Sequence, residues 1–287
     1  MIETTLPLAQ KAAQLFADRG FENARLEAEL LLAHVLGIKR LDLYLQFERP
    51  LTNAELESFR SLVRRRLKRE PLQYIVGSVG FRHLELLVDQ RALIPRPETE
   101  ILVGRAIDWA RTQTGALRAL DIGTGTGAIA LSLLHEKAAE RVVATDISAA
   151  ALDLAAENAV RTGLQDRLEF REGRTFQPIR DGEQFDIVIS NPPYVSPADR
   201  ETLQAEVRDW EPATALFAEA DGLAIVREII AAAPAHLRAG GLIALEVGMT
   251  QAQQVADEMR ALAAYENVDV VRDLTGRDRV VTAVRKE

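Results

Sequence analysis

Residues 119–134 read A-L-D-I-G-T-G-T-G-A-I-A-L-S-L-L and decide the fold of the chain. Residues 119–122 form a short, mainly apolar run that we expect to be a strand, and residues 128–134 form a mainly apolar run that we expect to be helical. The glycines between the two runs let the backbone approach a ligand at the N-terminus of the helix. A strand, a glycine-rich turn and a helix in this order predict the opening of a doubly wound α/β sheet.

The chain after residue 117 alternates between strand and helix patterns. We expect strands at residues 119–122, 142–145, 168–170, 185–189 and 242–247. Helical patterns lie between them at residues 128–134, 149–161 and 223–233. The predicted fold class is therefore α/β, with a doubly wound and mainly parallel sheet. Residues 268–272 and 280–284 flank a turn too short for a parallel crossover, so we expect an antiparallel C-terminal hairpin.

The first 71 residues contain helix patterns only. Asn23 can cap a helix that ends at Gly37. Thr52 with Glu55 gives a capping-box signature for a later helix. Turn glycines and alternating residues then suggest a β-hairpin. We expect three parts: a small all-helical substrate-recognition domain at residues 1–71, a β-hairpin linker at 72–94, and the α/β domain at 95–287.

A basic run, R-R-R-L-K-R at residues 64–69, ends this later helix. Its simplest interpretation is a solvated face at a helix C-terminus, where the helix dipole favours cations. The alternative is a contact for an anionic partner such as RNA.

The second informative motif is D-I-V-I-S-N-P-P-Y at residues 186–194. Its apolar run predicts a strand buried on both faces, and the prolines end that strand because they cannot donate to a ladder. Asn191 offers an amide oxygen and Pro192 a main-chain carbonyl, so the pair could hold a planar –NH2 group by both hydrogens. The Tyr194 ring could stack on that group or wall off its far side. Such a motif could hold a weak nitrogen nucleophile in front of an electrophile. The alternative is an Asn-Pro turn that only ends the strand and has no catalytic role.

Two acids near the glycine turn bear on the ligand. Asp146 closes the second strand, where a carboxylate can accept from both hydroxyls of an adenosine ribose. Its alternative role is to cap the following helix. NAD and S-adenosylmethionine both meet these demands, because the turn also fits a dinucleotide fingerprint. Asp121 favours S-adenosylmethionine, since a carboxylate there would repel a pyrophosphate but suits an ammonium and a sulfonium.

Composition bears on several classes of protein. The formal net charge of −8 argues against a protein that coats duplex DNA. The absence of cysteine rules out disulfide and thiolate chemistry and fits a reducing cytosol, so we expect a cytoplasmic protein. The four histidines are far apart in the sequence, and we expect no metal site. We expect neither a signal peptide nor a membrane span, because Pro234 and Arg238 interrupt the most apolar stretch.

Together the motifs resemble a known family. D-I-G-T-G-T-G, Asp146 and N-P-P-Y are similar to class I S-adenosylmethionine-dependent amino-methyltransferases. I-P-R-P-E-T-E at residues 94–100, the helical N-terminal domain and D-L-T-G-R-D-R at residues 273–279 narrow the likeness. The whole chain resembles the HemK/PrmC family, protein-(glutamine-N5) methyltransferases of bacterial peptide chain release factors.

The resemblance implies a reaction and a set of residues. The reaction is methyl transfer from S-adenosyl-L-methionine to the side-chain amide nitrogen of a glutamine in the Gly-Gly-Gln loop of a release factor. The catalytic residues would be Asn191, Pro192 and Tyr194, and Pro193 would join them in binding the substrate. Residues 173–176 should lie beside the adenine ring of the cofactor, although Arg174 stands where family members usually have an acidic residue. The cofactor set would be Asp121, Gly123, Thr124, Gly125, Thr126, Gly127, Asp146, Thr175 and Asn191.

Three other functions stay open at this point. An adenine-N6 nucleic-acid methyltransferase shares the N-P-P-Y chemistry, but the acidic chain and small helical domain speak against it. A nicotinamide-dependent oxidoreductase fits the glycine turn and leaves N-P-P-Y unexplained. A non-catalytic binding module is the third. We expect the partner to be a release factor docked by the helical domain, with no part for DNA, a membrane or a metal. Since no His, Cys or Lys stands beside N-P-P-Y as an evident base, we expect direct in-line displacement.

Overall fold

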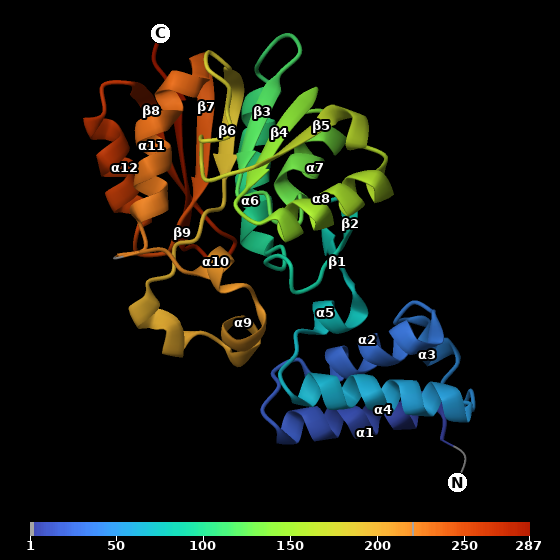
Figure 1. Cartoon of the computed structure of the whole chain (residues 1–287). Coiled ribbons are helices and arrows are strands. Elements are labelled where there is room, and N and C mark those ends of the chain that lie inside the picture. The colour runs from blue at the N-terminus through green and yellow to red at the C-terminus, as the bar shows by residue number, and fades with distance from the viewer. Residues whose placement is uncertain (1–2, 220) are drawn as a thin grey trace. The chain divides into compact units, whose positions relative to one another are not determined.

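The computed structural model describes residues 3–219 and 221–287. They form two compact units, whose elements are labelled in Figure 1. The first unit runs up to Gly77 and includes Gln204–Trp210, and the second comprises Ser78–Leu203 and Glu211–Glu287. The hairpin that we expected to be a separate linker belongs to the second unit by this division.

The first unit is helical. Its helices are α1 (Thr5–Asp18), α2 (Ala24–Leu36), α3 (Asp42–Leu45), α4 (Asn53–Leu67), α5 (Leu72–Val76) and α9 (Ala205–Trp210). Gly37 ends α2 in the left-handed conformation, and Thr52 and Glu55 form the expected capping box on α4. Phe16, Leu31 and Phe59 lie in its core with almost no exposed surface. Residues 72–76 are helical, so the expected hairpin is shorter than residues 72–94.

The basic run at the end of α4 is only partly a solvated face: Arg64 and Lys68 are exposed, but Arg66 is buried. The Arg66 side chain is only 6% exposed, and its guanidinium donates to Glu27 (2.6 Å) and to Glu206 of α9 (3.0 Å). Arg69 also donates to Glu206, at 3.2 Å. Both guanidinium groups lie over the Phe21 ring, at 4.2 and 4.0 Å from its centroid. Our solvated-face interpretation was therefore wrong for Arg66, whose charge is paired inside the unit and holds α9 there.

The second unit is the predicted α/β sheet. Its strands run in the order β5-β4-β3-β6-β7-β9-β8. They are β3 (Arg118–Ile122), β4 (Arg141–Asp146), β5 (Leu168–Glu172), β6 (Phe185–Ser190), β7 (Leu237–Glu246), β8 (Tyr265–Arg272) and β9 (Asp278–Arg285). The first five pair in parallel, while β9 pairs antiparallel with both β7 and β8. This confirms the mainly parallel sheet with an antiparallel hairpin at the end.

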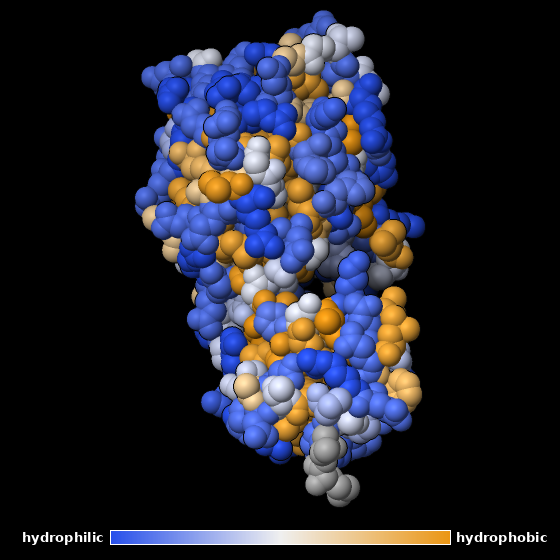
Figure 2. Space-filling model, turned by 90° about the vertical axis from the view of Figure 1, so that its right-hand side faces the viewer, coloured by the Kyte–Doolittle hydropathy of each residue, from blue (hydrophilic) through white to orange (hydrophobic). Residues whose placement is uncertain are grey.

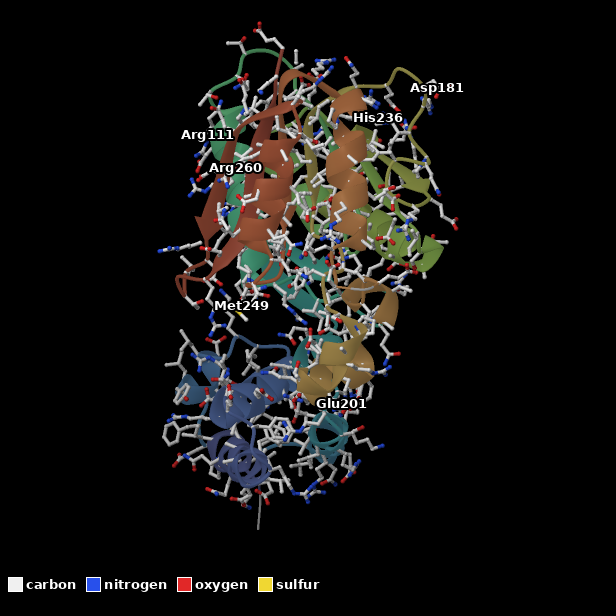
Figure 3. The ribbon with its side chains drawn as sticks, turned by 90° about the vertical axis from the view of Figure 1, so that its left-hand side faces the viewer. Arg111, Asp181, Glu201, His236, Met249 and Arg260 are labelled. Carbon is white, nitrogen blue, oxygen red and sulfur yellow. The ribbon has the colours of Figure 1, made fainter. Side chains whose placement is uncertain are left out.

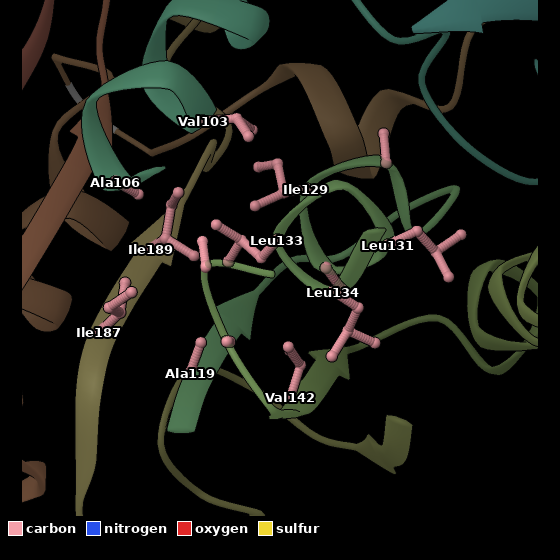
Figure 4. Close-up of a cluster of buried hydrophobic side chains, with 14 of the residues drawn as sticks. Val103, Ala106, Ala119, Ile129, Leu131, Leu133, Leu134, Val142, Ile187 and Ile189 are labelled. Atoms are coloured by element: carbon pink, nitrogen blue, oxygen red, sulfur yellow. The ribbon is translucent and has the colours of Figure 1, made fainter. Parts of the chain in front are cut away.

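Helices cover both faces of this sheet. On one face, α6 (Pro97–Ala110), α7 (Ala128–His135) and α8 (Ala149–Thr162) pack with the small hairpin of β1 (Ser78–Phe81) and β2 (Leu84–Leu87). Figure 4 shows side chains of α6 and α7 meeting those of β3, β4 and β6 in this layer. On the other face lie α11 (Ala224–His236) and α12 (Ala252–Ala261). Because both faces are covered, Ile187, Val188 and Ile189 of β6 have no exposed surface.

Two short elements complete the second unit near the end of β6. They are the 3-10 helix η2 (Pro197–Thr202) and α10 (Ala213–Leu216); a further 3-10 turn, η1 (Gln165–Arg167), precedes β5. The direction of the strands follows from Figure 3, where His236, just before β7, and Met249, just after it, lie at opposite ends of the sheet. The carboxyl ends of the parallel strands are thus at the Met249 end, where ligands bind in open α/β sheets.

Candidate active site

The topology brings the two sequence motifs together. The chain proceeds outward from β3 through β4 to β5 and then returns to β6 on the other side of β3. This reversal is the switch point of the sheet, where a crevice opens outside the strand ends. Ile122 and Ser190, the last residues of β3 and β6, are paired in register, and the Ser190 hydroxyl donates to the Ile122 carbonyl at 2.7 Å. The glycine turn and N-P-P-Y therefore start side by side.

The glycine turn depends on positive φ angles. Gly123, Gly125 and Gly127 have φ of 72°, 56° and 81°, which a residue with a Cβ rarely adopts. The Gly123 and Thr124 amides both donate to the Thr145 carbonyl of β4, at 2.8 and 2.9 Å. At Gly127 a Cβ would also come within 3.3 Å of the Ala155 side chain in α8. The turn is thus fixed against β4 with its remaining main chain facing the crevice.

Asp146 is held in place by backbone groups. Its Oδ2 accepts from the Gly125 amide (2.9 Å), and its Oδ1 accepts from the Ser148 amide (3.0 Å). The cap of α8 is the Ser148 hydroxyl, which accepts from Ala151, so Asp146 is not the helix cap that we considered as its alternative. Burial raises the pKa of Asp146, and these backbone donors oppose that rise. The carboxylate borders the cavity with acceptor capacity left for a ligand's hydroxyl groups.

Asp121 lies beneath the turn and does not border the cavity. Its Oδ2 accepts from the Thr124 hydroxyl (2.7 Å) and from the Ala130 amide at the start of α7 (3.2 Å). We expected it to face an ammonium and a sulfonium; in this structure it braces the turn instead, because its side chain is fully buried below it. Burial raises the pKa of Asp121 to about 7. Its Oδ1 is buried without a hydrogen-bond partner among the described residues.

The loop after β5 contributes main chain and Thr175 to the cavity. The Gly173 amide donates to the Asp146 carbonyl at 2.9 Å, which fixes the loop beside β4. Arg174 and the Thr175 hydroxyl both donate to Glu228 of α11. Phe176 turns away and stacks on His236, with ring centroids 4.8 Å apart. The unusual arginine at position 174 is therefore part of an ion pair with the neighbouring helix.

Asn191 is oriented by residues distant in the sequence. Its Nδ2 donates to the Thr99 hydroxyl at 3.0 Å, and Thr99 donates to Glu246 Oε2 at 2.7 Å. Thr99 belongs to I-P-R-P-E-T-E on α6, and Glu246 is the last residue of β7. Both side chains are buried, at 4% and 1% exposure. With Nδ2 engaged, the Asn191 amide has its oxygen free to accept a hydrogen bond.

Tyr194 does not border the cavity. Its hydroxyl donates to Glu246 Oε1 at 3.4 Å, and the Arg279 guanidinium lies 5.8 Å from its ring centroid. Burial raises the pKa of Tyr194 to about 12, so the phenol stays protonated. Of the two roles considered for the ring, stacking on the substrate amide does not fit its position outside the cavity lining, where Glu246 accepts from its hydroxyl. Pro192 and Pro193 do border the cavity, as does Asn191.

A second link ties I-P-R-P-E-T-E to the segment after N-P-P-Y. Glu211, whose side chain is 1% exposed, accepts from Arg96 at 2.5 Å and from the Ile94 amide at 3.3 Å. Burial raises the pKa of Glu211, and Arg96 opposes that rise. Glu211 therefore has a structural role, because it joins the start of I-P-R-P-E-T-E to the segment after N-P-P-Y.

These elements enclose one cavity of about 1060 Å³, counting its open mouth. Of the residues predicted from the sequence, it is bordered by Gly123, Thr124, Gly125, Thr126, Asp146, Thr175, Asn191, Pro192 and Pro193. Thr99, Glu246 and Glu211 were missed by sequence reasoning, although Thr99 lies in I-P-R-P-E-T-E, which was noted there without a role for its residues. Across the parts of the chain that the structure describes, no group of acids or histidines could hold a metal ion. No helix among the described residues is long and apolar enough to cross a membrane.

Comparisons with known sequences all match one family of methyltransferases. The profile of the PrmC N-terminal domain matches residues 8–77, and that of the methyltransferase small domain matches residues 107–208. A release factor glutamine methyltransferase of Geobacter sulfurreducens is 43% identical over 265 residues, covering 92% of this chain and 91% of its own. Its counterpart in Chlorobaculum tepidum is 40% identical over 285 residues, with coverage of 96% and 95%.

Comparisons with solved structures bear on the fold alone. The catalytic domain of hMettl16 superposes with a TM-score of 0.56 at 16% identity, over 69% of this chain and 74% of that one. A methyltransferase from Pyrococcus furiosus gives 0.51 at 18% identity, over 72% and 92%. The second unit therefore has the class I methyltransferase fold.

Proposed function

This chain belongs to the family of release factor glutamine methyltransferases, and we propose that it methylates the side-chain amide nitrogen, N5, of a glutamine displayed on a release factor loop. Two observations support the proposal together. Relatives with that name match almost end to end at about 40% identity. The Asn191 amide is also held with its oxygen free beside the cavity, the arrangement that a substrate –NH2 group requires.

The methyl donor in this proposal is S-adenosyl-L-methionine. Asp146 would accept from the ribose hydroxyls, and the main chain of Gly123–Gly127 would line the methionine part. Asp121, buried below the turn, would act indirectly by holding Thr124 and the start of α7 in place. Thr175 and the rest of its loop would lie beside the adenine ring. When bound, the sulfonium supplies an electrophilic methyl group.

Asn191 and Pro192 would hold the substrate amide. The Asn191 oxygen and the Pro192 carbonyl are two acceptors on a stiff turn, and a glutamine –NH2 carries two hydrogens. Gln251 fixes the end of this turn by donating to the Tyr194 carbonyl at 3.2 Å. The acceptors would orient the nitrogen lone pair toward the methyl group and stabilise the positive charge that develops on N–H during attack.

No general base is required before the attack. Among the described residues that border the cavity there is no His, Cys or Lys. The amide nitrogen is a weak nucleophile, and a proton leaves it readily only after the methyl group has been transferred. Positioning and electrostatic stabilisation are therefore the main contributions of this chain to the rate.

The helical unit would recognise the release factor protein. Leu41, Leu45 and Phe47 of this unit are 67%, 81% and 50% exposed, although large apolar side chains are normally buried. Figure 2 shows hydrophobic side chains exposed on the surface of the helical unit. A net charge of −8 disfavours approach to nucleic acid but not to a protein with basic patches. A cytoplasmic location, where release factors act, is part of the proposal.

The experiment is a comparison of methyl acceptors. The full chain is incubated with labelled S-adenosyl-L-methionine and a release factor, the same factor with its loop Gln replaced by Ala, or unmethylated DNA. We expect label in the first factor alone. Label in the DNA would favour the adenine-N6 alternative, and equal label in the Gln→Ala factor would contradict the assignment to that glutamine.

A further inference from the structure

Glu246 is a buried acid that the proposed reaction does not use. It stands at the end of β7, behind the Asn191 turn and outside the cavity lining. Its carboxylate accepts from Thr99 at 2.7 Å and from Tyr194 at 3.4 Å. A buried carboxylate is costly to keep, so its partners indicate what it does.

The hydrogen bonds leave one arrangement for Asn191. An ionised carboxylate only accepts, so the single hydroxyl proton of Thr99 must be donated to Glu246. Toward Asn191 the Thr99 oxygen can then act only as an acceptor, and it must face the amide nitrogen, Nδ2. The Asn191 oxygen is consequently turned away from Thr99 and is free for a ligand. Without this constraint, the amide could rotate and present its nitrogen instead.

We propose that Glu246 is a positioning residue for methyl transfer, which acts through Thr99 to keep the Asn191 oxygen available to the substrate amide. The inference rests on the proposed function, since it assigns Asn191 the task of accepting from the substrate –NH2. Thr99 is the middle residue of this hydrogen-bonded chain of Glu246, Thr99 and Asn191, which we call the positioning device. Tyr194, held by the other carboxylate oxygen, fixes the far side of the turn.

The device depends on the charge of Glu246. Burial raises its pKa to about 7, with Thr99, Arg279 and Tyr194 opposing the rise and Glu98 adding to it. A protonated Glu246 can donate to Thr99, whose own proton is then free to be donated to the Asn191 oxygen. The acceptor that the substrate needs is then occupied. Activity should therefore fall as the pH falls through about 7.

Two substitutions of Thr99 test this positioning by turnover at saturating cofactor and release factor. Thr99→Val removes the hydroxyl at nearly constant volume, and we expect kcat to fall about ten- to a hundredfold, as for a mispositioned catalytic group. Thr99→Ser retains the hydroxyl and should restore most of kcat. In each case the cofactor dissociation constant, measured by calorimetry, should stay near that of the wild type. Ser132→Ala, which removes a buried hydroxyl with no partner among the described residues, is the matched control for packing.

Glu246→Gln tests the charge. Glutamine can accept from Thr99 or donate to it, so we expect kcat at pH 8 to be lower than in the wild type. We also expect the decrease in kcat below about pH 7, the acid limb of the pH profile, to disappear. An unchanged acid limb in Glu246→Gln would assign it to another group, such as Asp121, and overturn the proposal. Wild-type kcat in Thr99→Val would overturn it as well. Either result leaves the proposed function intact, because that function fails only if the wild type does not label the release factor glutamine.

Discussion

At the scale of single residues, Asp146 shows how the backbone prepares a binding group. Its two oxygens are already fixed by the Gly125 and Ser148 amides, so a ribose would meet a carboxylate that need not be reordered.

We expect Asp146→Ala to weaken S-adenosyl-L-methionine binding by about 1.5–3 kcal/mol, the range for hydrogen bonds to a charged group. This corresponds to roughly a ten- to hundredfold higher dissociation constant. Titration calorimetry measures it, with Asp153→Ala, an exposed acid on α8, as the control. An unchanged constant would remove Asp146 from the cofactor site.

The sequence was enough to predict the position of site residues that directly follow a strand, while their roles remain proposals. Asp146 and Asn191 each follow a recognisable strand, so their position at the carboxyl edge of the sheet could be inferred. Thr99 and Glu246 could not be assigned a role, because the bonds Asn191–Thr99 and Thr99–Glu246 join residues 92 and 147 positions apart. The sequence also indicated that Asp121 lies at the glycine turn and Tyr194 at the end of N-P-P-Y. It could not indicate that both side chains lie outside the cavity lining, because the direction of a side chain depends on how the surrounding residues pack.

At the scale of elements, the N-P-P-Y turn is fixed by a glycine from a later segment. Gly222 precedes α11 with φ of 82°, and a Cβ there would lie 2.3 Å from the Tyr194 carbonyl oxygen. That distance is far below any real contact, so the turn or the segment would have to move.

We expect Gly222→Ala to lower both the melting temperature and kcat. The matched control is Gly182→Ala, where φ is 73° but a Cβ would meet nothing within 4 Å. The control carries only the strain of a left-handed alanine, about 1 kcal/mol. Differential scanning calorimetry and turnover distinguish the two variants. Equal kcat in both would show that the turn does not depend on Gly222.

Element prediction succeeded where periodicity and turn chemistry agree. The sheet, the C-terminal hairpin and the capping box of α4 were all expected. Residues 72–76 were assigned to the hairpin, yet they form α5, whose Tyr74 and Ile75 are buried. Within the basic run, Arg66 was misjudged, because the acids that neutralise it come from α2 and α9.

At the scale of the whole molecule, the two units divide the work in the proposed function. The chain passes from N-P-P-Y in the second unit to α9 in the first and back to Glu211. Recognition of the protein substrate is assigned to the first unit and methyl transfer to the second.

We expect Leu45→Ser to raise KM for the release factor about tenfold and to leave kcat unchanged, since loss of a docking contact affects binding alone. Leu274→Ser is the control, because Leu274 is 94% exposed on the second unit. Steady-state kinetics with intact release factor measure both. A KM that changes equally in the two variants would show that Leu45 has no special part in docking.

Asn191 is proposed to act directly on the substrate amide, and replacing it in Asn191→Ala should greatly slow methyl transfer without releasing the cofactor. The measurement is the rate of methyl transfer to the release factor at saturating cofactor, beside the calorimetric dissociation constant for S-adenosyl-L-methionine. We expect a rate lowered roughly a hundredfold or more, as for a lost preorganised polar group, with nearly unchanged cofactor binding. Near-normal turnover in this variant would contradict the account.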